Sequence, residues 1–286
     1  MDAEPARPPL KFCYYHSAMS PSPHFWLILM LGTIAASANL IGGALMLLRR
    51  SISDRHMTFG LALSGGFLLT ISILNIMPEC VHAMPAAGPA LIAAGYFFVY
   101  IMEQIFAGHA HNTVLAPHGS HPLIGALPCE DDNAQIRPAA AAAATVGLIL
   151  HSFFDGAAIT AAVSTHPEIG WLTFFGVAFH KIPEGFSLAA IVLSCTGNRG
   201  RAFRLTVWLG LSSLLGTMTT LAAIPMVVGI EKVVLAVAAG MFFYIAATDL
   251  LPATTHVKGL GTLGMTLGGF LTALLVSGIL HVVLAG

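Results

Sequence analysis

Charged residues are scarce in this 286-residue sequence. Asp, Glu, Lys and Arg make up 9% of it, whereas soluble globular domains carry roughly a quarter. Hydrophobic residues reach 56% and the mean hydropathy is +0.83. A chain this poor in charge cannot cover a surface that faces water, so much of its surface is predicted to face lipid. The net charge of −1 provides no basic face, which excludes nucleic acid as an expected partner.

Cysteine is scarce as well, and several enzyme motifs are missing. The four cysteines lie far apart with no Cys-x-x-Cys pair, which argues against a disulfide framework or a thiolate zinc site. Neither His-Glu-x-x-His nor Gly-x-Ser-x-Gly occurs, which argues against an intramembrane zinc hydrolase. We expect no cleavable signal peptide, because the first 23 residues are polar and rich in Pro and the first apolar run is long enough to span.

Long apolar segments are the main feature of the sequence. A spanning helix needs about 20 mostly apolar residues, and the sequence contains eight such runs, at about 24–48, 57–80, 88–107, 139–164, 169–195, 203–229, 232–253 and 260–285. The predicted fold is an all-α polytopic membrane bundle. Its parts are an N-terminal tail (1–23), helices 1–3 (24–107), a His-bearing loop (108–138), helices 4 and 5 (139–195) and helices 6–8 (196–286).

The distribution of Lys and Arg predicts the orientation in the membrane. Cytoplasmic loops carry an excess of these residues. With the N-terminus outside, the cytoplasmic loops hold Arg49, Arg50, Arg55, Arg137, Arg199, Arg201, Arg204 and Lys258, and the outer segments hold only Arg7, Lys11 and Lys232. We therefore expect both termini on the extracytoplasmic side of a plasma (inner) membrane, with the 108–138 loop in the cytoplasm.

Two short patterns occur twice. An [Asn/Asp]-x-x-Pro pattern begins at Asn75 and again at Asp249, and a His-x-x-x-[Asp/Glu]-Gly pattern begins at His151 and again at His180. These echoes fit a 3+2+3 pseudo-symmetric arrangement, in which the first three helices mirror the last three around a central pair. Internal repeats of this kind are common in secondary transporters, whose sites lie at the repeat interface.

The central pair of helices carries the candidate metal ligands. Residues four apart share one helix face, so His151 with Asp155 and His180 with Glu184 should converge if the helices face each other. Imidazole and carboxylate suit zinc, and also iron(II), manganese and cadmium. A carboxylate at the bilayer centre costs about 2.5–3.5 kcal/mol, which a passing cation would compensate. The alternative is a structural salt bridge from Lys181 to either carboxylate.

Small residues follow each carboxylate of this set. Gly156 and Gly185 would let the two central helices approach closely, as small residues do in membranes.

The segments His151-Ser-Phe-Phe-Asp-Gly and His180-Lys-Ile-Pro-Glu-Gly resemble the paired signatures of the ZIP family (Zrt-, Irt-like proteins). The resemblance implies an often dimeric helical bundle that moves zinc, iron or manganese toward the cytoplasm by an elevator-type motion. It also implies His151, Asp155, His180 and Glu184 as ligands. The resemblance also implies a comparison with several bacterial members of the family, whose transport site looks binuclear. The positions that would hold the second metal in those members are occupied in this sequence by Ser152, Lys181 and Ser213. A lysine ammonium repels a second cation, so we expect a mononuclear site.

Other polar residues carry weaker predictions. Asn75, Glu79 and Asp249 are predicted to line the pathway, the alternative being local caps at helix ends broken by Pro. Four histidines of the long loop are predicted to capture metal loosely, the alternative being a solvated linker; they are His109, His111, His118 and His121.

The predicted function is a divalent metal ion transporter, not an enzyme, with zinc as the first candidate substrate and iron, manganese or cadmium as others. The expected partners are the metal ion, the lipid bilayer and a second copy in a homodimer, and no organic cofactor is expected. The alternatives are an intramembrane zinc-dependent hydrolase and a non-transporting metal sensor on the same scaffold. A cation diffusion facilitator is disfavoured, because it has fewer spans and a soluble C-terminal domain.

Overall fold

The computed structural model describes residues 24–48, 54–111, 138–254 and 260–284, and the regular structure in these ranges is helical throughout. The described part contains eight helices long and apolar enough to cross a membrane, which confirms the predicted fold class. They are Phe25–Leu48, Thr58–Ala83, Gly88–Ile105, Ala144–Thr165, Pro167–Thr196, Arg199–Ala223, Ile230–Ala253 and Leu260–Val283.

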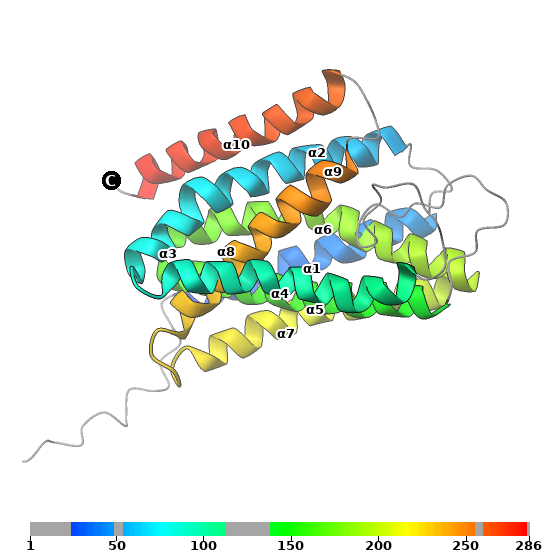
Figure 1. The fold of residues 1–286 in the computed structure, drawn as a ribbon, viewed down its shortest axis with the longest axis horizontal. Coiled ribbons are helices and arrows are strands. Elements are labelled where there is room, and N and C mark those ends of the chain that lie inside the picture. Colours follow the sequence, from blue (N-terminus) through cyan, green and yellow to red (C-terminus); the bar gives the residue numbers. More distant parts are fainter. Residues whose placement is uncertain (1–23, 49–53, 112–137, 255–259, 285–286) are drawn as a thin grey trace, which may run out of the picture.

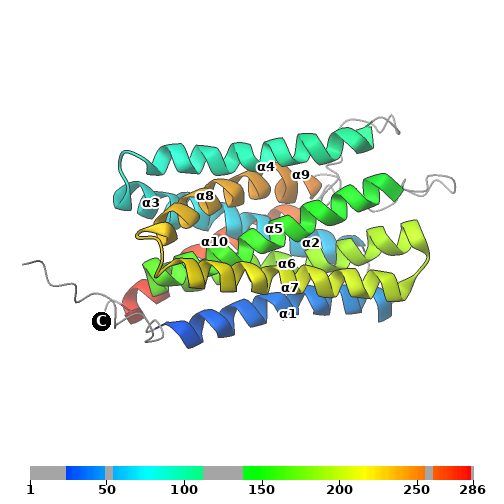
Figure 2. The same cartoon turned by 90° about the horizontal axis from the view of Figure 1, so that it is seen from below.

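The helices lie side by side along one axis (Figures 1 and 2). Four of them form one group, in which α1 (Phe25–Leu48) packs on α6 (Pro167–Thr196) and α7 (Arg199–Ala223), and α5 (Pro138–Thr165) packs on α6 and α7. In a second group, α2 (Asp54–Ile71) packs on α10 (Leu260–Leu284), and α4 (Gly88–His111) packs on α8 (Ile230–Tyr244). The two groups meet where α5 contacts α8 and α2 contacts α6.

The bounds of two predicted segments differ in the structure. The sixth span covers Arg199–Ala223 instead of 203–229, because Asn198 caps its N-terminus by accepting a hydrogen bond from the Arg201 N–H (2.9 Å). Its C-terminal part is replaced by a turn that ends at Gly229, whose φ of 78° suits glycine. The backbone of α4 continues through His111, so the first residues assigned to the long loop are helical.

Both [Asn/Asp]-x-x-Pro patterns coincide with π-helical segments. Asn75 lies in η1 (Ser72–Ile76), which precedes Pro78 in α3 (Met77–Ala83). Asp249 lies in η2 (Ile245–Leu250), which precedes Pro252 in α9 (Leu251–Ala253). A proline lacks the N–H that would continue the helical hydrogen bonds, and a π segment is a common local adjustment at functional positions. The first and last groups of helices thus contain the same local π-helical adjustment at corresponding positions.

The glycines after the site carboxylates have different partners from those we expected. A Cβ on Gly156 would lie 1.9 Å from the carbonyl oxygen of Ser213 on α7, and a Cβ on Gly185 would lie 2.1 Å from that of Asn39 on α1. Each central helix therefore uses its glycine to approach an outer helix of its own group, and the prediction that these glycines join α5 to α6 is wrong.

Among the eight described spans, α6 is the most enclosed. In its most apolar window, 72% of α6 is buried, whereas the corresponding window of α10 is only 11% buried and that of α4 is 22% buried. Many large apolar side chains on α4 and α10 are exposed, as expected for lipid contact, among them Phe97, Ile101, Leu271 and Leu275. The candidate ligands on α5 and α6 therefore lie at the centre.

Candidate metal site

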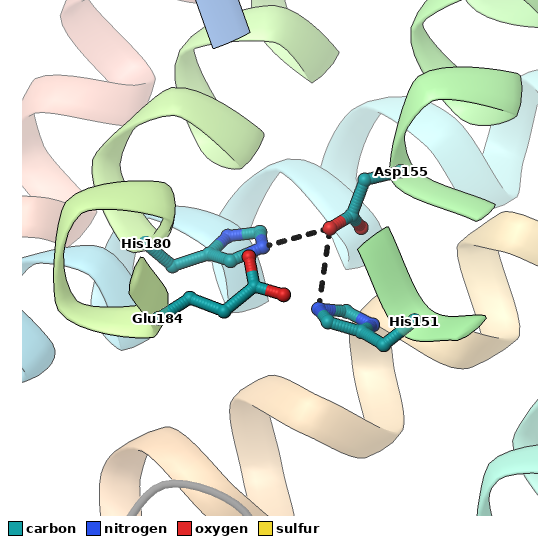
Figure 3. Close-up of side chains that lie close together, drawn as sticks. All are labelled: His151, Asp155, His180 and Glu184. Atoms are coloured by element: carbon teal, nitrogen blue, oxygen red, sulfur yellow. Dashed lines mark hydrogen bonds and ion pairs between the residues drawn. The ribbon is translucent and has the colours of Figure 1, made fainter. Parts of the chain in front are cut away.

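The four predicted ligands lie together between α5 and α6. His151 and Asp155 are one turn apart on α5, and His180 and Glu184 are one turn apart on α6 (Figure 3). One ligand atom from each residue lies within 4.8 Å of the others. The Oδ2 atom of Asp155 is 3.2 Å from Nε2 of His151 and 3.4 Å from Nε2 of His180.

This spacing suits a small cation. Two ligands of one tetrahedral zinc ion are about 3.3 Å apart, given metal–ligand distances of about 2.0–2.2 Å. Asp155, His180 and Glu184 are at most 2% exposed, and the side chain of His151 is 16% exposed. The arrangement therefore offers two nitrogen and two carboxylate ligands in a largely dry pocket.

Two atoms of the cluster form no hydrogen bond with the residues that the structure describes, although one of them lies 3.2 Å from Oδ2 of Asp155. These are Oε1 of Glu184 and Nε2 of His151, and both are buried. An unsatisfied buried polar atom is costly, and a cation between the helices would use both lone pairs. The Nδ1 atom of His180 lies 2.9 Å from the carbonyl oxygen of Gly176. Because a carbonyl only accepts, Nδ1 carries the proton, and Nε2 presents its lone pair to the cluster.

Lys181 lies beside the cluster and is fully buried. Its Nζ is 2.6 Å from Oδ2 of Asp155, 2.6 Å from Oε2 of Glu184 and 2.8 Å from Oγ of Ser152. Lys181 therefore forms an ion pair with Asp155 and with Glu184, as the alternative of a structural salt bridge expected. The same two carboxylates are candidate metal ligands. With neutral imidazoles, the group carries one net negative charge. A divalent cation would therefore enter a site whose charge is already half neutralised.

One residue of this site was missed in the sequence. Asn39 of α1 is fully buried, and with its amide oriented to suit its neighbours it donates to Oε2 of Glu184 (3.2 Å) and to the carbonyl oxygen of Lys181 (2.8 Å). It therefore holds one candidate ligand in place from a third helix. The available signal was a single amide within the apolar run 24–48.

The serines expected at the second-metal places are both buried. Ser152 accepts from Lys181 and donates to the carbonyl oxygen of Leu209 on α7 (3.1 Å). Ser213 lies on α7, where its Oγ forms no hydrogen bond within the described part of the chain. Neither serine brings a carboxylate or an imidazole to these places, and the lysine ammonium is the charged group there.

Two of the three predicted pathway residues line a common cavity. Asn75 and Glu79 line one cavity, where Nδ2 of Asn75 donates to Oγ of Ser277 (2.8 Å). Asp249 is buried in η2, accepts from Oγ1 of Thr248 (3.1 Å) and is not among the residues that line this cavity. A pathway role for these three residues stays a prediction.

The loop histidines are only partly described. The backbones of His109 and His111 belong to the end of α4, whereas His118 and His121 lie outside the described residues. Metal capture by this loop stays a prediction.

Comparison with known proteins is consistent with this geometry. The family model described as ZIP zinc transporter matches residues 126–277. Proteins named zinc transporter ZupT are 25% identical in Enterobacter sp. (strain 638) and 24% identical in Salmonella arizonae, in each case over 234 residues that cover 80% of this chain and 87% of the relative. The matched region exceeds half of the chain and includes all four residues of the cluster. The chain therefore belongs to the ZIP family, as an integral membrane protein that transports divalent metal and is not an enzyme.

Proposed function

We propose that this protein transports zinc toward the cytoplasm through a site formed by His151, Asp155, His180 and Glu184. The observation that carries the proposal is the convergence of four ligand atoms within 4.8 Å, two from each central helix. The names of the relatives support zinc as the substrate. Iron(II), manganese and cadmium are further candidate substrates, because the same ligand types bind them.

The placement of the ligands supports passage of the ion over permanent retention. All four ligands and the supporting Asn39 belong to α1, α5 and α6, which pack in one group of helices. The group can carry the ion as a body past α2, α4, α8 and α10, as the expected elevator-type motion requires. No ligand is contributed by the second group, so that motion would break no metal–ligand bond.

We further propose that the site holds one ion. Lys181 occupies the position beside Asp155 and Glu184 that a second cation would need, and it already contributes a positive charge there. At such short range two like charges repel strongly in a medium of low polarity. Ser152 and Lys181 then orient the carboxylates, and Ser213 fills the remaining space on α7.

The proposed orientation of the protein in the membrane rests on the distribution of Lys and Arg between the two ends of the bundle. The start of α1 and the end of α10 lie at one end of the bundle, and the start of α7, which carries Arg199, Arg201 and Arg204, lies at the other (Figure 2). The excess of cations at this second end supports a cytoplasmic location for it and an extracytoplasmic location for both termini. A plasma (inner) membrane location and a homodimer are proposed with it.

Radiolabelled zinc uptake into proteoliposomes tests the proposal. We expect saturable uptake by the native chain and loss of uptake in His180→Ala and in Glu184→Ala. Glu231→Gln is the matched control, because Glu231 lies in the first turn of α8, outside the cluster. Competition by unlabelled manganese, iron(II) and cadmium ranks the substrates. Zinc retained tightly by well-inserted native protein without any flux would refute transport and favour the sensor.

A further inference from the structure

A second group of metal-binding side chains surrounds a cavity at one end of the bundle. The cavity has a volume of about 340 Å³, and its lining includes Glu79, His82, Glu168 and His281. These residues come from α3, the start of α6 and the end of α10. In Figure 1, α3 and the C-terminal end of α10 lie at the same end of the molecule. The proposed orientation makes this end extracytoplasmic.

Two imidazole–carboxylate pairs connect α6 to its neighbours here. Nε2 of His166 lies 3.4 Å from Oε1 of Glu79, and Nδ1 of His281 lies 3.8 Å from Oε2 of Glu168. Both separations exceed a normal hydrogen bond of about 2.7–3.2 Å. The first is close to the spacing of about 3.3 Å between two ligands of one zinc ion, and the second exceeds it by about half an ångström.

Helix-end electrostatics explain part of this pattern. Glu168 lies in the first turn of α6, and His82 and His281 lie in the last turns of α3 and α10, where these charges are favourable. Glu79 gains nothing from this effect, because α3 continues the helical backbone of α2 and η1 and has no free N-terminus. The effect does not account for the convergence of these residues on one cavity, whose described lining contains two carboxylates and no Lys or Arg.

The cavity is separate from the central cluster. Leu172 lines the cavity, and His180 lies eight residues farther along α6, a rise of about 12 Å. Between them, Gly176 of α6 faces the side chains of Leu68 and Ile71 of α2, both fully buried. Apolar side chains of α2 thus pack against α6 between the two groups of ligands.

We propose that this cavity binds a divalent cation, such as zinc, as a capture site that precedes the central one. Glu79 and Glu168, together with the imidazoles of His82 and His281 that line the same cavity, provide the protein ligands, and water completes the coordination of the ion. Two carboxylates without a lining Lys or Arg also raise the local concentration of cations before any ligand bond forms. The role in uptake rests on the proposed transport function, but the binding itself does not.

The binding test uses protein whose other candidate sites are removed. The background chain carries His180→Ala and Glu184→Ala, together with alanine at the four loop histidines, and zinc binding is measured by equilibrium dialysis with radiolabelled zinc. We expect one weakly bound ion per background chain and at least a tenfold loss of its affinity on adding Glu79→Gln and Glu168→Gln. Glu231→Gln is the matched control and should leave the affinity unchanged. Absence of this ion, or its retention in the double Gln variant, overturns the proposal.

The role in uptake is tested in the chain with an intact central site. Glu79→Gln with Glu168→Gln should raise the KM for zinc about tenfold, at the lower end of the effect of a focusing charged cleft, and leave the maximal rate unchanged. An unchanged KM overturns the capture role. Exposed ion pairs contribute little to stability, so the double variant should fold; a native melting temperature in detergent checks this. If the proposed transport function is wrong, the native chain will show no zinc uptake. The binding measured by dialysis does not depend on that result.

Discussion

Replacing Lys181 with methionine should destabilise the metal-free protein and tighten zinc binding. Lys181 is 0% exposed, and its ammonium lies 2.6 Å from a carboxylate oxygen of both Asp155 and Glu184. Removing one partner of a buried ion pair costs about 3–5 kcal/mol, because a charge is left without compensation. Methionine keeps the length and most of the volume of the side chain, so loss of the charge dominates the effect.

The magnitude can be followed by thermal unfolding in detergent. At about 2 °C per kcal/mol for a chain of this size, the Lys181→Met variant should melt about 6–10 °C below the native protein in the presence of a chelator. Zinc should restore most of the difference, since a ligand at 100 times its Kd stabilises by about 2.7 kcal/mol. The same carboxylate oxygens become available to the ion, so the Kd for zinc should fall at least tenfold.

Lys232→Met is the matched control for this experiment. Lys232 is exposed in the first turn of α8, and its replacement should change neither the melting temperature nor the Kd. If Lys181→Met melts at the native temperature in chelator and binds zinc with native affinity, the ammonium does not compensate the two carboxylates, and the reasoning fails.

Three further predictions follow from the same contacts. Lys181→Asp should change the stoichiometry of the central site from one to two zinc ions, measured by equilibrium dialysis in a Glu79→Gln and Glu168→Gln background; a single ion would contradict the assignment of this position to a second metal. Asn39→Ala removes both amide hydrogen bonds, including the one to Glu184, and should lower kcat/KM for zinc about 10–100-fold, as loss of a ligand-supporting group does; native uptake kinetics would exclude that support. Gly185→Ala places a Cβ 2.1 Å from a backbone carbonyl oxygen and should cost at least about 1–3 kcal/mol by overpacking, whereas Gly278→Ala, with nothing within 4 Å, should leave the melting temperature unchanged.

The sequence was most informative where one helix decides the geometry. The four-residue spacing of His151 with Asp155, and of His180 with Glu184, determines a shared helix face regardless of what surrounds it, and the structure places each pair on one face. The apolar runs likewise predicted eight spans, because the length of a run alone decides whether it can cross a bilayer.

The sequence was least informative where the packing between helices decides. Gly156 and Gly185 contact α7 and α1, and no spacing within α5 or α6 could have indicated these partners. Asn39 reaches Glu184 across 145 positions of sequence, and only the arrangement of α1 against α6 shows the contact. The matching patterns at Asn75 and Asp249 both lie in π-helical segments, but the two side chains have different surroundings. Asn75 lines the cavity, whereas Asp249 is buried and accepts a hydrogen bond from Thr248.

The charge of the central group bears on how a carrier could return without its ion. With neutral imidazoles, Asp155, Glu184 and Lys181 together carry one net negative charge when metal-free and would carry one net positive charge with a divalent ion bound. Without the lysine these values would be two negative charges and zero. The cost of holding charge away from water rises steeply with its magnitude, so a carrier without Lys181 would be stable when loaded and costly when empty. On the proposed function, Lys181 makes the two states comparable: it weakens the hold on zinc, and it lets the metal-free site remain buried while the helices that carry it move back.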